Sequence, residues 1–106
     1  IALYQIGIDN LVKCGFDEED AKMLIKPLVK NNVDAFLEKG SVNALTGPVE
    51  RNDISTVRKH LDVLSGDDRE IYRLLGKKLV SVAQEKNQDR NYEKLKEVFM
   101  ERKTTK

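Results

Sequence analysis

The sequence predicts an all-α fold, a helical bundle of about five helices, and three of its features support this prediction. Apolar residues recur three and four positions apart in successive segments, as on one face of an α-helix. Capping residues such as Asp and Asn precede several of these segments, and Gly follows several. No alternating, β-branched stretch is long enough to indicate a strand. With 106 residues, 40% of them hydrophobic, residues 1–106 are expected to form a single domain around one core.

The first predicted helix runs from Ile1 to about Val12 and is apolar on nearly all sides. Such a helix needs cover on both faces, so we expect it at the centre of the fold or in contact with another chain. Gly15 is suited to the left-handed turn that ends it. No capping residue precedes the helix and the first residue is not Met, so the segment is expected to be cut from a longer protein.

The second predicted helix is capped by Asp17 and continues to about Lys39, where Gly40 terminates it. Pro27 removes a backbone hydrogen bond inside this helix and predicts a kink over the preceding turn. Its broad apolar stripe consists of Ala21, Leu24, Ile25, Leu28, Val29, Val33 and Phe36.

The residues between Gly40 and Asn52 form the least regular stretch inside the domain. Gly47 and Pro48 together rule out an ordinary helix there. A loop that combines Thr, Gly, Pro, Arg and Asn is a better place for a ligand contact than any of the helical faces.

Three shorter helices are expected after this loop. Asp53 caps the first, which Ser65 and Gly66 end; Asp67 caps the second, which runs to about Glu85; and Asn91 caps the last, before a charged tail over residues 101–106. The residues expected to face inward are Ile54, Val57, Leu61 and Leu64, then Ile71, Tyr72, Leu74, Leu75, Leu79, Val82 and Ala83, and finally Tyr92, Leu95, Val98 and Phe99.

Composition excludes several classes of function. Nineteen basic and eighteen acidic residues leave a net charge of +1, which gives no general attraction for nucleic acid or anionic lipid. No apolar run approaches the roughly 18 residues needed to span a bilayer, so no membrane segment is expected. The single cysteine, Cys14, has neither a disulfide partner nor a metal-binding cluster around it, and a cytoplasmic location is expected.

Few side chains stand out as candidates for chemistry. His60 falls on the edge of the third predicted helix without an obvious partner, which favours an ordinary surface or inter-helix histidine over a catalytic one. Lys78 is expected to extend outward from its apolar stripe, and Asn32 to be a structural amide. The acidic run from Asp17 to Asp20 lacks the spacing of a metal-binding loop. No glycine-rich phosphate loop occurs, so this segment alone is not expected to bind a dinucleotide.

Residues 44–61 carry a longer pattern: A-L-T-G-P, then an arginine and an aspartate two positions apart, then T-V and H-L. This pattern resembles the C-terminal helical domain of Rossmann-like oxidoreductases whose C-terminal domain has no assigned function, relatives of pyrroline-5-carboxylate reductase and 6-phosphogluconate dehydrogenase. Tyr72, Leu75 and Ala83 also agree with it. Asn52 stands where the pattern has glycine, but asparagine tolerates the left-handed conformation, so the turn is expected to survive.

The resemblance implies a fold like the 6-phosphogluconate dehydrogenase C-terminal domain, preceded by an N-terminal Rossmann domain of the same polypeptide that binds NADP or NAD. It implies a homodimer and a substrate cleft between the domains, lined or shaped by Thr46, Gly47, Pro48, Arg51, Asp53 and His60. No catalytic residue and no metal follow from it. Two hypotheses stay open: a dimerisation and substrate-side domain of an NAD(P)-dependent oxidoreductase, inactive alone, or a stand-alone helical protein-interaction module.

Overall fold

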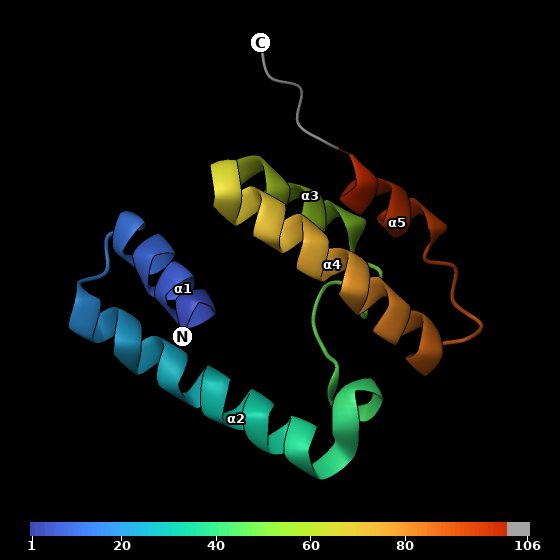
Figure 1. Cartoon of the computed structure of the whole chain (residues 1–106), viewed down its shortest axis with the longest axis horizontal. Helices are drawn as coiled ribbons and strands as arrows, with labels where there is room; N and C mark the ends of the chain where they lie inside the picture. The colour runs from blue at the N-terminus through green and yellow to red at the C-terminus, as the bar shows by residue number, and fades with distance from the viewer. Residues whose placement is uncertain (102–106) are drawn as a thin grey trace. The chain divides into compact units, whose positions relative to one another are not determined.

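The computed structural model describes residues 1–101, and every regular element in that range is an α-helix (Figure 1). The all-α prediction is therefore confirmed. The predicted charged tail lies outside the described residues except for Glu101. The five helices are α1 (Ala2–Lys13), α2 (Glu18–Ala44), α3 (Ile54–Val63), α4 (Gly66–Lys86) and α5 (Glu93–Met100).

The chain divides into two compact units, Ile1–Gly40 and the part that begins at Ser41, here called unit 1 and unit 2. They meet within α2 at Gly40, whose φ of 80° and ψ of 175° interrupt the helix before its last turn. The predicted end of the regular helix at Gly40 is thus confirmed. Pro27, which was expected to kink the helix, keeps helical dihedral angles. The expectation of a single domain over residues 1–106 stays a prediction.

Unit 1 is a helical hairpin of α1 and the long first part of α2. Gly15 makes the turn between them with a φ of 105°, as the sequence predicts. Asp17 caps α2, because its Oδ1 accepts a hydrogen bond from the Asp20 backbone N–H at 2.8 Å. The two helices are in contact at Gly7, where an added Cβ would lie 3.2 Å from the Ile25 Cδ1 atom.

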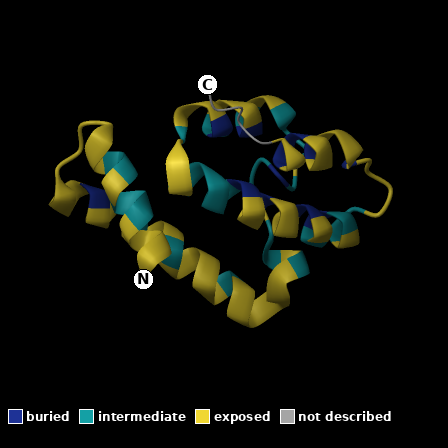
Figure 2. Cartoon of the chain, turned by 45° about the horizontal axis from the view of Figure 1, so that its top comes forward, coloured by how far each residue is buried: buried dark blue, intermediate teal, exposed yellow. Residues whose placement is uncertain are grey.

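The hairpin buries very little of its own apolar surface. Ala21 is the one residue of unit 1 that is buried, and α1 contains none (Figure 2). Asn32, expected to be a structural amide inside the stripe, is exposed. The large apolar side chains exposed on this unit are Ile1, Leu3, Tyr4, Val12, Phe16, Met23, Leu24, Leu28, Val33, Phe36 and Leu37.

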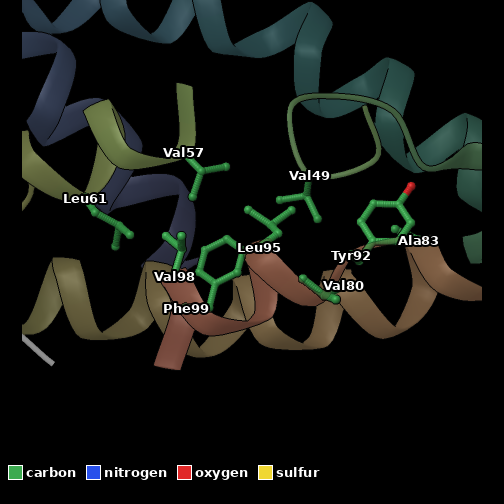
Figure 3. Close-up of a cluster of buried hydrophobic side chains, with 9 residues drawn as sticks. All are labelled: Val49, Val57, Leu61, Val80, Ala83, Tyr92, Leu95, Val98 and Phe99. Atoms are coloured by element: carbon green, nitrogen blue, oxygen red, sulfur yellow. The ribbon is translucent and has the colours of Figure 1, made fainter. Parts of the chain in front are cut away.

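Unit 2 contains the hydrophobic core (Figure 3). Helix α5 packs against both α3 and α4, which also contact each other. Every inward residue predicted for α5 is buried, as are Val57 and Leu61 of α3. The core consists of Val49, Val57, Leu61, Val80, Ala83, Tyr92, Leu95, Val98 and Phe99.

The inward face of α4 differs from the predicted one. Leu74, Leu75 and Leu79 are exposed rather than buried. The buried residues of this helix are Arg73, Gly76, Val80 and Ala83. The prediction was wrong because apolar residues of several types spread around much of α4, so the apolar pattern alone does not define which side packs.

Contacts with α5 select the face that α4 buries. Gly76 has no side chain, and an added Cβ would overlap the Phe99 ring, so glycine permits the close approach. Arg73 is only 3% exposed and donates from Nη1 to the Phe99 carbonyl at 2.9 Å. Its guanidinium also forms a bidentate pair with the Glu70 carboxylate at 3.0 and 2.6 Å, which compensates the buried charge.

The starts of α4 and α5 correct two predicted caps. Helix α4 begins at Gly66, so Asp67 lies in its first turn and is not the cap. At this position its carboxylate interacts favourably with the positive end of the helix dipole. Helix α5 begins at Glu93 with Tyr92 in the cap position. Asn91, the predicted cap, lies one position before Tyr92, yet its Oδ1 accepts a hydrogen bond from the Glu93 backbone N–H at 2.9 Å.

Candidate functional site

Unit 2 has a half-open cavity of about 300 Å³ beside its core. Helices α3, α4 and α5 and the loop after α2 all contribute to its wall. Among the described residues, the wall contains no Asp, Glu, Lys or Arg. Its lining residues are Thr46, Pro48, Val49, His60, Tyr72, Leu75, Gly76, Leu79 and Phe99.

The loop wall of this cavity has a defined backbone shape. Gly47 adopts a φ of 106°, which glycine tolerates because it has no Cβ. Asn52 adopts a φ of 57° and donates from Nδ2 to the Asn91 carbonyl at 2.9 Å. The expected left-handed turn at Asn52 is therefore confirmed, and its side chain ties the loop to the start of α5.

The connection between α4 and α5 holds the same loop by its carbonyl groups. The Glu50 carbonyl accepts hydrogen bonds from the Tyr92 hydroxyl at 2.6 Å and from Arg90 Nη1 at 2.7 Å. The Lys86 ammonium donates to the Leu45 carbonyl at 2.7 Å. These loop carbonyls have no partner within a helix or strand, so the side chains supply their hydrogen bonds. The wall formed by the loop is therefore held in one conformation before a ligand binds.

Besides Thr46, the cavity wall contains a hydrogen-bonded polar pair from α3 and α4. His60 Nδ1 lies 2.7 Å from the Tyr72 hydroxyl oxygen, and the two rings meet edge to face at a centroid distance of 5.5 Å. The Tyr72 ring also packs against Phe99, with 6.1 Å between centroids. Burial raises the pKa of the Tyr72 hydroxyl above its ordinary value of 10.0. His60 thus has a partner that the sequence did not reveal.

Asp53 lies outside the cavity wall and acts on α3. Its carboxylate accepts the Thr56 backbone N–H at 3.1 Å and the Thr56 hydroxyl at 2.8 Å, so the predicted cap is confirmed. The hydroxyl bond is the largest cause of its lowered pKa, followed by the backbone bond. The positive charges of Arg51 and Lys59 lower this pKa further.

The structure brings together part of the predicted site. Thr46, Pro48 and His60 line the cavity, and Gly47 lies between the first two in the chain. Arg51 is exposed and, like Asp53, is not among the lining residues. A cleft role for Arg51 and Asp53 stays a prediction.

The sequence reasoning missed the contribution of α4 and α5. It assigned Tyr72, Leu75, Leu79 and Phe99 to the core; Phe99 is indeed a core residue, but all four also line the cavity. The spacing of His60 and Tyr72, twelve residues apart across the Ser65–Gly66 break, could have indicated that these two side chains meet. Two helices joined by so short a link place the end of the first beside the start of the second.

Other candidate features contribute no site. Within residues 1–101, no three His, Cys, Asp or Glu side chains gather in a way that could hold a metal ion. No helix of that range has the length and apolar character needed to cross a membrane. Lys78 is exposed, in agreement with the expected outward orientation.

These observations define an all-α protein with an apolar cavity beside its core and one histidine–tyrosine pair in the wall. Residues 1–79 match the family described as "Domain of unknown function (DUF2520)", and the chain belongs to this family. The match covers unit 1 and most of the cavity wall but ends before Phe99. No curated protein and no solved structure shows significant similarity to the chain.

Proposed function

We propose that the chain is the dimerisation and substrate-side domain of an NAD(P)-dependent oxidoreductase and is inactive alone. One observation carries this proposal: the loop that resembles the oxidoreductase pattern forms a cavity wall together with a histidine–tyrosine pair. Thr46 and Pro48 belong to that loop, and His60 and Tyr72 form the pair. Concave apolar sites with a few converging polar groups are typical of small-molecule binding.

The cofactor of such an enzyme has to be held elsewhere. The cavity wall offers no Lys or Arg for a pyrophosphate group, and the sequence has no glycine-rich phosphate loop. We therefore assign NADP or NAD to a Rossmann domain of the same polypeptide on the N-terminal side of Ile1. A cytoplasmic location, where Cys14 stays reduced, belongs to the same proposal.

The homodimer is supported by the exposed apolar side chains of unit 1. A two-helix hairpin that buries Ala21 alone needs further apolar cover, because helices are stabilised by packing in layers. A second copy is the occupant we propose. Unit 1 carries seven acidic and five basic residues, so two identical faces repel each other only weakly. A two-fold contact would bury the same face of both copies at once.

The proposal is tested on a longer version of the protein that includes the residues before Ile1. This version should bind NADPH or NADH, measured by quenching of the nicotinamide fluorescence, whereas residues 1–106 should bind neither. Absence of dinucleotide binding by the longer version, with its folding verified by circular dichroism, would contradict the oxidoreductase assignment.

The exposed apolar face of unit 1 also favours a second candidate, a stand-alone helical protein-interaction module. In that case the hairpin docks on a different protein and no cofactor domain is needed. The two candidates differ in the sequence upstream of Ile1: a strand, a G-x-G-x-x-G turn and a helix belong to the oxidoreductase alone. They also differ in self-association, since the module has no need of a second copy.

A further inference from the structure

The cavity of unit 2 restricts the chemistry of what can occupy it. Five of its lining side chains, from Pro48, Val49, Leu75, Leu79 and Phe99, are fully apolar. The described wall has no acidic, Lys or Arg side chain that could pair with an ionised ligand. An unpaired charge seated among these apolar side chains would lose part of its hydration without compensation, so the wall disfavours carboxylates, phosphates and ammonium groups.

The histidine–tyrosine pair gives the cavity a polar group that can act in two ways. If His60 Nδ1 accepts the hydrogen from Tyr72, the tyrosine oxygen keeps acceptor capacity for a ligand hydroxyl. If Nδ1 carries the hydrogen and donates it, the tyrosine O–H is free to donate to a ligand carbonyl. The neutral imidazole with hydrogen-free Nδ1 therefore suits an alcohol, and the tautomer with hydrogen on Nδ1 suits a ketone or aldehyde. The pair can thus bind both oxidation levels of one compound.

The volume of the cavity gives a scale for the part of a ligand that can lie inside it. A dry cavity of about 150 Å³ in another protein accommodates benzene. The cavity here, at about 300 Å³, is roughly twice as large and matches an apolar body of two fused six-membered rings.

We propose that the cavity of unit 2 binds an uncharged carbonyl compound or its alcohol, with an apolar body of about ten carbon atoms, and that the His60–Tyr72 pair holds its oxygen. The inference rests on the proposed function where it identifies this ligand as the substrate. The binding itself needs no cofactor and is measured on residues 1–106.

The test compares four probes that share one ring system: 2-tetralone, 2-tetralol, tetralin and tetralin-2-carboxylate. Binding is followed by chemical-shift changes in ¹H–¹⁵N spectra of residues 1–106. The ketone and the alcohol should bind with similar affinity and at least about tenfold more tightly than the carboxylate. They should exceed tetralin by a few-fold, and the shifts should concentrate on the cavity wall.

Two variants separate the roles of shape and polarity. Tyr72→Phe keeps the ring and removes the hydroxyl, so the preference for ketone and alcohol over tetralin should disappear while tetralin still binds. Leu79→Trp adds bulk from a partly exposed position of α4 and should weaken all four probes. Thermal melts followed by circular dichroism verify that each variant remains folded. If Leu79→Trp does not fold, the shift map of the unaltered chain still locates the binding site.

Four results of the titrations would overturn the inference, and a fifth concerns protein concentration. The four are absence of binding by the ketone and the alcohol at millimolar concentration, carboxylate binding as tight as ketone binding, shifts confined to unit 1, and Tyr72→Phe with an unchanged preference for ketone. A ketone affinity that falls as protein concentration rises would identify a second copy of the chain as the occupant and would also overturn it. The NADPH measurement on the longer protein is independent, so either proposal can fail alone.

Discussion

Asp53 illustrates how a single side chain can shape the candidate site without lining it. Its carboxylate closes the first turn of α3 through two bonds to Thr56, and α3 presents His60 two turns further along. The cap fixes where the helix starts, and therefore which side of it His60 occupies. A residue of the 44–61 pattern can thus serve the site by fixing where a helix begins.

The cap of α3 predicts a specific dependence of stability on pH. The pKa of Asp53 lies below its ordinary value of 3.8 in the folded chain, mainly because of the Thr56 hydroxyl bond. Its contribution to stability is therefore complete above the unfolded pKa of 3.8 and is lost as pH falls through the folded pKa. We expect Asp53→Ala to lower the melting temperature by a few degrees at pH 7, and by less as the pH falls below 3.8.

Two control variants sharpen this measurement, which uses thermal melts by circular dichroism over a pH series. Asp53→Asn keeps an acceptor for the backbone N–H, so it should retain most of the stability while losing the pH dependence of this group. Asp62→Ala removes an exposed carboxylate near the other end of α3 and should change little. Equal effects of Asp53→Ala at all pH values would contradict the charged cap.

The proposed function places Arg51 in a substrate cleft, whereas the cavity of unit 2 does not include it. Its side chain is exposed and outside the cavity wall, so a contact with substrate or cofactor has to come from the proposed cleft between domains. In the longer protein, Arg51→Ala should lower kcat/KM by about tenfold or more, the loss expected for one charge-assisted hydrogen bond. The melting temperature should stay unchanged. Arg58→Ala, an exposed arginine on α3, is the matched control, and equal kinetics of the two variants would remove Arg51 from the site.

At the scale of single elements, the sequence predicted which segments become helices and failed on the face that one of them buries. The starts of α2 and α3 carry local signals, an aspartate followed by an amphipathic stretch, and local signals are readable without the fold. The face of α4 is decided by a partner far away in the sequence, because Phe99 of α5 needs the gap at Gly76. The cavity was missed for the same reason, since its wall joins residues from four segments.

The contact between α4 and α5 predicts that Gly76→Ala destabilises the protein. An alanine Cβ at this position would overlap the Phe99 ring, which is fully buried and cannot move freely. We expect a loss of about 1–3 kcal/mol in the free energy of unfolding, typical of overpacking, measured by urea denaturation. The cost should outweigh the gain of up to about 1 kcal/mol that alanine brings over glycine inside a helix.

Gly7→Ala is the matched control for this contact. It makes the same change inside a helix, but the new Cβ would meet only the end of the flexible Ile25 side chain, at 3.2 Å. Its stability should equal or exceed that of the unaltered chain. If Gly76→Ala were as stable as Gly7→Ala, the close packing of α5 on α4 would be wrong.

At the scale of the whole molecule, the two units differ in how well they satisfy their own apolar surfaces. In the described part of the chain, unit 2 has a core of nine buried residues, whereas unit 1 buries Ala21 alone. The sequence indicated that the first helix needs cover on both faces, at the centre of the fold or from another chain, because it is apolar on nearly every side. It did not indicate the division at Gly40, which depends on contacts and not on a change of composition.

The uncovered hairpin leads to the prediction that a single charge on it breaks the dimer. Leu28 of α2 is 65% exposed, so Leu28→Lys should leave the folded hairpin intact but place an unpaired ammonium in the proposed interface. We expect the dissociation constant of the dimer to rise at least about tenfold, measured by sedimentation equilibrium over a concentration series. Val63→Lys makes a similar change at an 81% exposed position of α3 in unit 2 and should leave the dimer unaltered. A chain that is monomeric at every concentration would show that unit 1 does not join two copies. A dimer that Val63→Lys weakens and Leu28→Lys does not would show the same.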